Sequence, residues 1–482
     1  MMNKGILTFL VVEAGIVYAS AAAVSEPTSP SVPQATLNLR ETKLGTLPFT
    51  TKLSDVEASH DNLHHCYVVG LPDHWRLRHD GREGPLYNRI YTGLYSPNGE
   101  RLAYVARNEE GTLVVLDGKE GKPYERIADS LVFSPDSRHI CYFAVLPGRK
   151  FALVLDGTES GNWDQAHSFV FSQDGAHHAY AALGNGRWAV IRDGTPGDSF
   201  DNGIRPDSIR FSPDSQRLGY VAATGHKNVA VVDGHPGKAT DGIFGPLCFS
   251  PDSRHVAYAA KQGNRFQIVR DEKSMGDFEE VSADEIVFSP DSKHLAYIAV
   301  RNDKWCLVLD EVPGPEWDGI GNGSVVFSPN SQRVAYAAKQ GLRWRIVVVN
   351  EGQGSEFDGI HYQWAQFSPD SRRMAYLASR EGKWRLVLDG REGKPYDKRT
   401  ARSPGFAFSP DSQHIAYFAR HDKKECLVVD DMEAGDYEDS RAVFFSNANA
   451  VRALVTKENV MFDRELFRLD VTIRTPNEKE RD

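Results

Sequence analysis

The chain has 482 residues, 40% hydrophobic, 25% charged and 10% aromatic, which is the composition of a folded protein with ample material for a core. Its formal net charge of −10 argues against a nucleic acid as the main partner, because a phosphate backbone attracts positive surfaces. The 41 glycines and 25 prolines favour a fold with many turns.

Residues 1–23 resemble a secretory signal peptide. Lys4 gives a positive start, an apolar run follows, and the alanines at 21–23 offer small-residue cleavage sites. Glu13 interrupts the apolar run, so an uncleaved membrane anchor is the alternative. Residues 24–45 begin with a stretch rich in Ser, Pro and Thr and are expected to form a linker. We therefore expect an exported protein, periplasmic or extracellular, that contacts a membrane only through such an anchor.

From about residue 56 to residue 472 the chain repeats one unit, whose most regular part is the string Phe-Ser-Pro-Asp-Ser. Successive copies lie 37 to 41 residues apart. The clear copies begin at Tyr95, Phe133, Phe171, Phe211, Phe249, Phe288, Phe327, Phe367, Phe408 and Phe445, and a worn further copy lies at 58–67. A period of this length is typical of propellers and other repeat folds.

Each copy contains the pattern of four short strands. After the apolar run at 130–133 comes a Ser-Pro-Asp-Ser turn, and strands are expected at 139–145 and 150–157, the latter ending in Asp-Gly. A fourth strand carries text such as Lys-Pro-Tyr-Asp at 394–397. The middle strands are apolar on both faces, as expected for a sheet packed between two others. We therefore predict an all-β fold, a β-propeller built from ten to eleven four-stranded repeats of about 39 residues.

The strings FSPDSxHxAYxA and WxLVLDG resemble the WD-repeat-like units of TolB-type bacterial propellers. The likeness covers nearly all of the chain after residue 56, and it implies a propeller that binds or scaffolds rather than one particular activity. TolB itself carries an α/β domain before its propeller, for which residues 24–55 are too few. Propeller peptidases add an α/β-hydrolase domain, and the repeats leave too few residues in this chain for one.

Two questions about how the propeller closes have more than one answer in the sequence: which segment completes the last blade, and whether the blades form one ring or two. The copies supply eleven first strands but ten fourth strands, so the last blade lacks one strand. The segment 46–53 could supply it, which would join the two ends of the chain and cover a sheet edge. We therefore expect the propeller repeats over 46–474 and a charged tail at 475–482. A single large ring and two consecutive rings, such as five plus six blades, are equally consistent with the even spacing.

The five cysteines are predicted to be free thiols. Cys66 and Cys141 hold one repeat position two copies apart, and Cys306 and Cys426 hold another three copies apart. Equivalent positions on blades that are not neighbours lie too far apart for a disulfide, and Cys248 stands alone on a first strand.

Ten acidic or amide residues follow the fourth-strand aromatic at equivalent positions, from Asn88 to Glu438. They suggest a ring of cation ligands, but outer-strand positions lie too far apart around a propeller to share one ion. We expect each of them to hydrogen-bond local amides instead.

The string His-Asp-Asn-Leu-His-His at 60–65 places three histidines close to Asp61 and suggests a metal site. His64, however, holds the position that His139 holds in another copy, at the start of the second strand. A recurrent polar position is typical of a solvated strand end, so the sequence predicts no metal and no cofactor here.

The string His-Tyr-Gln-Trp at 361–364 is the largest aromatic departure from the repeat. It lies between a fourth strand and the next first strand, where propeller chains cross toward the central channel. Stacked aromatic rings with polar neighbours suit a sugar or a peptide, so His361, Tyr362 and Trp364 are the candidate ligand-binding residues. The alternative is that Trp364 fills the channel or packs on a neighbouring loop.

No nucleophile elbow, zinc-protease motif or phosphate-binding loop is present in the sequence. We therefore predict an exported, non-catalytic β-propeller that presents its loops to a protein or glycan partner. The alternative is a propeller hydrolase or lyase whose loop histidines and acids act at the mouth of the channel.

Overall fold

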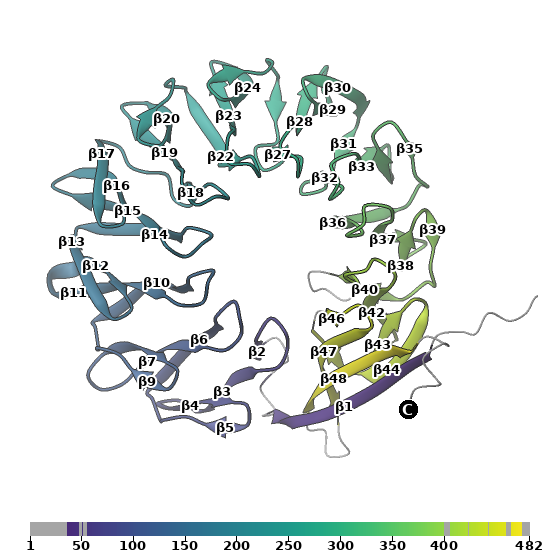
Figure 1. Ribbon diagram of the computed structural model, residues 1–482, viewed down its shortest axis with the longest axis horizontal. Helices are drawn as coiled ribbons and strands as arrows, with labels where there is room; N and C mark the ends of the chain where they lie inside the picture. Colours follow the sequence, from purple (N-terminus) through teal and green to yellow (C-terminus); the bar gives the residue numbers. More distant parts are fainter. Residues whose placement is uncertain are drawn as a thin grey trace, which may run out of the picture. The chain divides into compact units, whose positions relative to one another are not determined.

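Antiparallel sheets of four or five strands follow one another around a ring formed by residues 37–473 (Figure 1). The computed structural model describes residues 36–47, 51, 55–399, 405–422, 424–441, 443–458 and 464–474, without the side chains of residues 92, 129–130, 362–364 and 398–399. Within these ranges the sheets number eleven. The predicted all-β propeller is confirmed, and a single ring of eleven blades is found rather than two rings. The expected signal peptide at 1–23 and tail at 475–482 lie outside the described residues.

In blades 1 to 10 the strands follow chain order from the inside of the ring to its rim (Figure 1). Blade 1 consists of β2 (Glu57–Ala58), β3 (His65–Leu71), β4 (His74–His79) and β5 (Arg82–Glu83), and blade 2 of β6 (Arg89–Tyr95), β7 (Leu102–Arg107), β8 (Thr112–Leu116) and β9 (Lys119–Glu120). Blade 3 consists of β10 (Arg126–Phe133), β11 (Ile140–Leu146), β12 (Lys150–Leu155) and β13 (Thr158–Trp163). Blade 4 consists of β14 (Gln165–Phe171), β15 (His178–Gly184), β16 (Arg187–Arg192) and β17 (Thr195–Phe200). A short 3₁₀ turn (Pro147–Arg149) joins β11 to β12.

Blade 5 consists of β18 (Arg210–Phe211), β19 (Leu218–Thr224), β20 (Lys227–Val232) and β21 (His235–Pro236), and blade 6 of β22 (Gly242–Phe249), β23 (Val256–Gln262), β24 (Arg265–Arg270) and β25 (Lys273–Ser274). Blade 7 consists of β26 (Glu280–Val281), β27 (Val287–Phe288), β28 (Leu295–Arg301), β29 (Lys304–Leu309) and β30 (Val312–Trp317). Blade 8 consists of β31 (Gly319–Ile320), β32 (Val326–Phe327), β33 (Val334–Gln340), β34 (Arg343–Val348) and β35 (Gly352–Gln353). In blades 7 and 8 the first strand is split in two.

Blade 9 consists of β36 (Gly359–Phe367), β37 (Met374–Arg380), β38 (Lys383–Leu388) and β39 (Arg391–Glu392). Blade 10 consists of β40 (Lys398–Arg399), β41 (Phe406–Phe408), β42 (Ile415–His421), β43 (Lys424–Val429) and β44 (Met432–Tyr437). Blade 11 consists of β45 (Asp439–Ser440), β46 (Phe444–Asn447), β47 (Ala450–Glu458), β48 (Arg464–Arg474) and β1 (Thr36–Leu47). Blade 11 is therefore built from both ends of the described chain.

The Ser-Pro-Asp-Ser turn links neighbouring blades as well as neighbouring strands. In blade 7 the Ser289 hydroxyl donates to the Asp291 carboxylate at 2.6 Å, which fixes the turn itself. The second serine, Ser292, adopts a φ of 66° and accepts a hydrogen bond of 2.8 Å from the amide of Asp252 in blade 6. The same link recurs between further pairs of blades, such as Asp214 to Ser253 at 2.9 Å. The repeated motif thus sets the spacing of the blades.

The core lies between the blades, in a series of separate clusters. One cluster joins β28 and β29 of blade 7 to β33 and β34 of blade 8 and buries Tyr336, which is 1% exposed. In several blades the aromatic residue at the outer edge packs edge-on against the second-strand tyrosine of the next blade, as Phe278 does on Tyr297 with ring centroids 5.7 Å apart. Because each sheet is covered on both faces, its middle strands are apolar throughout rather than alternating.

The ring closes through β1, which pairs with β48 as the outermost strand of blade 11 (Figure 1). The prediction that the N-terminal segment completes the last blade is correct, but the predicted segment 46–53 is wrong, since the strand runs from Thr36 to Leu47. The linker expected at 24–45 is wrong over residues 36–45, which belong to this strand, and its first part lies outside the described residues. Alternating exposure along β1 fits an edge strand with one face on the core. Leu47 packs with Val56 and Tyr67 of blade 1 and so seals the ring.

All five cysteines are free, four of them buried and Cys248 partly so, which confirms the predicted thiols. Burial raises the pKa of the Cys426 thiol to about 11, so this thiol stays protonated and unreactive at neutral pH. The described part of the chain holds no helix with the length and hydrophobicity of a transmembrane span.

Candidate functional site

The segments that cross from one blade to the next reach one face of the ring, which we call the crossing face. In blade 3, Arg126 at the start of β10 pairs with Val145 near the end of β11, and Val145 pairs with Phe151 near the start of β12. The start of β10, the end of β11 and the start of β12 therefore all lie at the crossing face. The register of β10 with β11 shifts between Ala128 and Val132, so the first strand bulges as it turns into the blade.

A groove of 1340 Å³ lies on the crossing face of blades 2, 3 and 4. Apolar side chains from the three blades form its floor, among them Ile127 and Phe151 of blade 3. Tyr91 and Leu94 of blade 2 stand 38% and 37% exposed within it, which is unusual for large apolar residues in this ring. A second depression of 480 Å³ over blades 1 and 2 shares Tyr91 with the groove as a lining residue, so the two lie next to each other. An extended apolar surface of this kind is typical of a binding site.

Three exposed arginines surround this groove, namely Arg107, Arg126 and Arg149. Within the described residues none of the three guanidinium groups has an ion-pair or hydrogen-bond partner. Elsewhere in the ring arginines are commonly engaged, as Arg333 is with Glu351 through two bonds of 2.7 Å.

Two acids also line the groove, Glu125 and Asp164. The Asp164 carboxylate is paired with the ammonium group of Lys150, so this acid does not neutralise the arginines. The groove therefore combines an apolar floor with an excess of unpaired positive charge.

The predicted ligand-binding residues lie in blade 9, away from this groove. His361 is half-buried in β36 and pairs with Leu377, and the register shifts between His361 and Gln366, so this crossing segment bulges. The side chains of Tyr362 and Trp364 lie outside the described residues, so their predicted role stays a prediction. His361 does not line the groove over blades 2 to 4.

Several of the outer-strand acids bind amides as expected, but these amides are not local: Asp241 and Asp318 accept from amides 22 and 23 residues further along the chain, and each acid is also paired with a lysine. Asp318 accepts a hydrogen bond of 2.6 Å from the amide of Gly341 and is paired with the ammonium group of Lys304 in its own blade. The hydrogen bond from Lys304 holds the pKa of Asp318 below its usual value. Asp318 is therefore already occupied by the protein.

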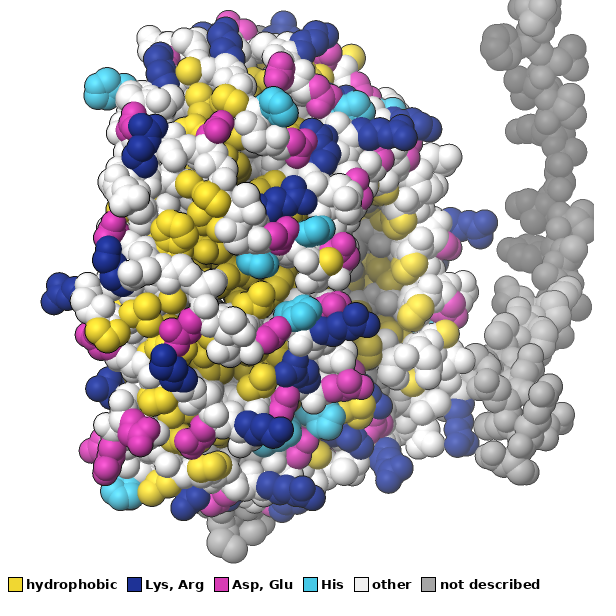
Figure 2. All heavy atoms as spheres, turned by 60° about the vertical axis from the view of Figure 1, so that its left-hand side comes forward, with side chains coloured by type: hydrophobic (Ala, Val, Ile, Leu, Met, Phe, Trp, Pro, Cys, Tyr) yellow, Lys and Arg dark blue, Asp and Glu magenta, His cyan; other side chains and the backbone are white. Residues whose placement is uncertain are grey.

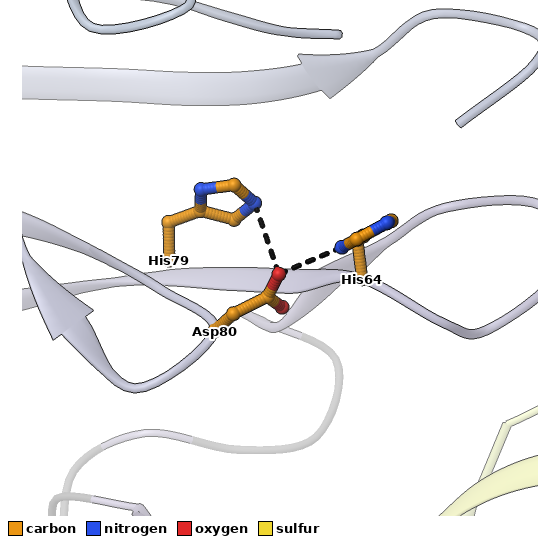
Figure 3. A group of neighbouring side chains, drawn as sticks. All are labelled: His64, His79 and Asp80. Atoms are coloured by element: carbon orange, nitrogen blue, oxygen red, sulfur yellow. Dashed lines mark hydrogen bonds and ion pairs between the residues drawn. The ribbon is translucent and has the colours of Figure 1, made fainter. Parts of the chain in front are cut away.

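The residues of the 60–65 string are separated by the fold. The ring of His60 packs edge-on against Phe444 at 5.1 Å, and Asp61 accepts a hydrogen bond of 2.6 Å from Ser59. His64 instead meets His79 and Asp80 from the end of β4, and one ligand atom from each of the three lies within 4.8 Å of the others (Figure 3).

His79 and Asp80 do not stand out in the sequence, because they meet His64 across the strand pair rather than along the chain. One signal for His79 is present in the repeats, because other copies have a leucine at its position, namely Leu155 and Leu309.

Neither a protein-family model nor a curated protein matches this sequence. Similar solved structures include a eukaryotic initiation factor, with 13% identity over 77% of this chain and 96% of the other and a TM-score of 0.39. The Dos1 propeller has 12% identity over 70% and 90% of the two chains and a TM-score of 0.33. A putative TolB from Agrobacterium tumefaciens has 14% identity over 42% and 82% and a TM-score of 0.24. The similar structures thus include TolB and WD-type propellers, and the likeness concerns the fold alone.

Proposed function

We propose that this ring is a non-catalytic binding protein that holds an acidic, partly hydrophobic protein segment in the groove over blades 2 to 4. The observation that carries the proposal is the set of three unpaired arginines, Arg107, Arg126 and Arg149, around an apolar groove of 1340 Å³. Guanidinium groups bind carboxylates through paired hydrogen bonds, and the exposed rings and aliphatic side chains of the floor accommodate hydrophobic residues.

A protein segment fits this groove better than a glycan. Sugars are commonly recognised by stacking on open aromatic faces. The described aromatic ring most exposed in the groove is Tyr91, and the guanidinium carbon of Arg89 lies 5.0 Å from its centroid, so one face of the ring is already covered.

A displayed library of random peptides, selected on the wild-type protein, tests the proposal. The enriched peptides are expected to combine acidic with hydrophobic residues and to bind at least tenfold more weakly at 0.5 M than at 0.05 M salt, since salt screens exposed charges. Arg126→Glu should lower their affinity at least tenfold, and Tyr91→Ala should lower it severalfold. The matched control is Arg254→Glu, the same reversal at an exposed position away from the groove.

Peptides that bind the Arg126→Glu variant and the wild type equally well would contradict the proposal. A glycan array probed in parallel distinguishes the other partner class, because selective glycan binding without peptide enrichment would refute a protein partner.

The hydrolase alternative has one arrangement that bears on it. The Nδ1 atom of His167, in the groove, lies 2.7 Å from the Ser168 hydroxyl. That hydroxyl also accepts a hydrogen bond of 3.0 Å from the amide of Asp207 in the next blade, and Ser168 adopts a φ of 60°. The pair therefore serves to hold the crossing segment. Labelling of Ser168 by a fluorophosphonate probe would favour the hydrolase instead.

We also propose that the protein is exported. The support is the charged start, apolar run and small-residue sites of residues 1–23. The intact mass of protein from its native host is expected to place the mature start near Ala22 or Val24. A full-length species that remains with the membrane fraction would contradict cleavage and indicate an anchor.

A further inference from the structure

A histidine–aspartate pair recurs on the face opposite the crossing face. In blade 3, His139 at the start of the second strand lies 2.6 Å from the Oδ2 atom of Asp156, which follows the third strand. The other oxygen, Oδ1, accepts a hydrogen bond of 2.9 Å from the amide of Ile140. Blade 7 repeats this arrangement with His294 and Asp310, also at 2.6 Å. Figure 2 shows histidines beside acidic side chains several times on the face turned toward the viewer.

Blade 1 adds two more imidazoles to this pair. His65 stands where blade 3 has Ile140, and His79 stands where blade 3 has Leu155. Both of those positions are apolar in most blades because they face the core of the sheet. Replacing an apolar residue by an imidazole there costs free energy unless the ring nitrogens find partners.

Those nitrogens lack hydrogen bonds. His65 is only 4% exposed, and among the described residues its Nδ1 atom has no hydrogen-bond partner, although it lies 3.2 Å from Asp80 Oδ1. The buried Nε2 atom of His79 likewise has no hydrogen-bond partner in the described chain and lies 3.4 Å from Asp80 Oδ2. His64 Nδ1 lies 2.7 Å from the same Oδ2 atom.

The three side chains converge from two neighbouring strands (Figure 3). His64 precedes β3, while His79 ends β4 and Asp80 begins the turn after it, so the hairpin register brings them together. A tetrahedral Zn²⁺ ion with nitrogen and oxygen ligands at 2.0–2.2 Å places ligand atoms about 3.4 Å apart. The distance of 3.4 Å from Asp80 Oδ2 to His79 Nε2 matches that spacing, and the hydrogen-bonded distance of 2.7 Å to His64 Nδ1 would lengthen when a metal ion replaces the shared proton. The ring of Tyr95 from blade 2 lies against both imidazoles, with centroids 6.5 and 5.9 Å away.

We propose that His64, His79 and Asp80 bind one divalent transition-metal ion of the Zn²⁺ type, with a fourth coordination position open to water or to a partner. His65 is a positioning residue, since its ring lies beside the Asp80 oxygen that faces away from the other imidazoles. Such outer partners of metal-binding carboxylates typically alter affinity by 10- to 100-fold.

Blade 4 provides an internal comparison. There His177 lies 2.8 Å from Asp193, and His178 stands in the position of His65, 3.4 Å from the other oxygen. The third position is Arg192, whose guanidinium lies 3.7 Å from Asp193. A fixed positive charge in place of the third ligand excludes a metal ion, so blade 4 has the histidine pair without the site.

The test uses the full chain, stripped of metal with a chelator and titrated with Zn²⁺ in a calorimeter and with Co²⁺ in a visible spectrometer. We expect one tight equivalent of metal, and a Co²⁺ absorption typical of tetrahedral nitrogen and oxygen ligands. His79→Leu and His64→Arg introduce residues that other blades carry at these positions, Leu155 and Arg101, so both variants should fold. Each is expected to lower Zn²⁺ affinity at least tenfold while leaving the melting temperature of the metal-free protein within a few degrees.

His178→Leu in blade 4 is the matched control and should retain the tight site. If the tight equivalent is absent from wild type, or if it survives both blade 1 substitutions, the proposal is overturned. Loss of binding in His178→Leu but not in His79→Leu would also refute it, because the metal would then be in blade 4.

Discussion

Glu285 is a buried carboxyl group between blades 7 and 8, and its ionisation should limit the stability of the ring. It lies between β26 and β27, is 1% exposed, and accepts a hydrogen bond of 3.4 Å from the amide of Val325 in blade 8. Its other oxygen has no hydrogen-bond partner in the described chain. Burial disfavours the charged form, with a smaller contribution from neighbouring Asp284, and raises the pKa of Glu285 from 4.5 to about 7.

The sign of the effect follows from proton binding. Between pH 4.5 and about 7 the folded ring holds the proton on Glu285 more strongly than the unfolded chain does, so folding is favoured at low pH and this advantage is lost as the pH rises through 7. Each pH unit in this window is worth about 1.4 kcal/mol. Ionisation of this one group should therefore cost about 3 kcal/mol of the free energy of unfolding by pH 8.

Glu285→Gln removes the charge and keeps the size and the acceptor for Val325. Urea unfolding followed by tryptophan fluorescence should give nearly equal stabilities for variant and wild type at pH 4.5. At pH 8 the variant should be more stable by about 3 kcal/mol. Glu280→Gln, at an exposed position nearby, is the control and should leave the pH dependence unchanged. The reasoning is refuted if Glu285→Gln keeps the pH dependence of the wild type, or if it is the less stable protein at pH 8.

Three further predictions concern architecture. Phe288→Ala empties a buried site at β27 and should cost about 3–5 kcal/mol, whereas Asp291→Ala loses only turn hydrogen bonds and should cost about 1 kcal/mol; equal losses in a denaturant series would contradict this. Leu47→Ala, where blade 11 meets blade 1, should lower the free energy of unfolding by about 2–4 kcal/mol, and an unchanged urea midpoint would mean that β1 does not close the ring. Thiol titration of denatured, unreduced protein should find five thiols, and three or fewer would indicate a disulfide.

The local structure of this protein follows from its repeated sequence. Ser-Pro-Asp-Ser and Asp-Gly fix turns by short-range hydrogen bonds and by left-handed residues such as Asp156, with a φ of 49°. Apolar runs between the turns can only be strands covered on both faces. The free thiols followed for the same reason, because repeat position fixes which blade holds Cys66 or Cys306. These features depend on residues close together in the chain, which is why sequence alone was sufficient.

Neither the groove nor the cluster of His64, His79 and Asp80 is apparent in the sequence. Arg107, Arg126 and Arg149 belong to two neighbouring blades and meet only because the blades stand side by side. His79 lies near His64 because β3 pairs with β4, and the two residues are too far apart in the chain to form a visible motif. The predicted residues at 361–364 were chosen because they depart from the repeat, and departure from a repeat marks a special position without locating its partners.

What the sequence by itself determined is the blade: its length, its strands, its turns and its number of copies. What only the tertiary structure decided is how the blades close. The number of blades in one ring depends on the small rotation between neighbouring sheets, which is set by packing such as that of Phe278 on Tyr297 and has no signature within a single copy. Pairing of β1 with β48 joins residues more than 400 positions apart, so the strand at 36–47 is defined by a partner that no local pattern reveals.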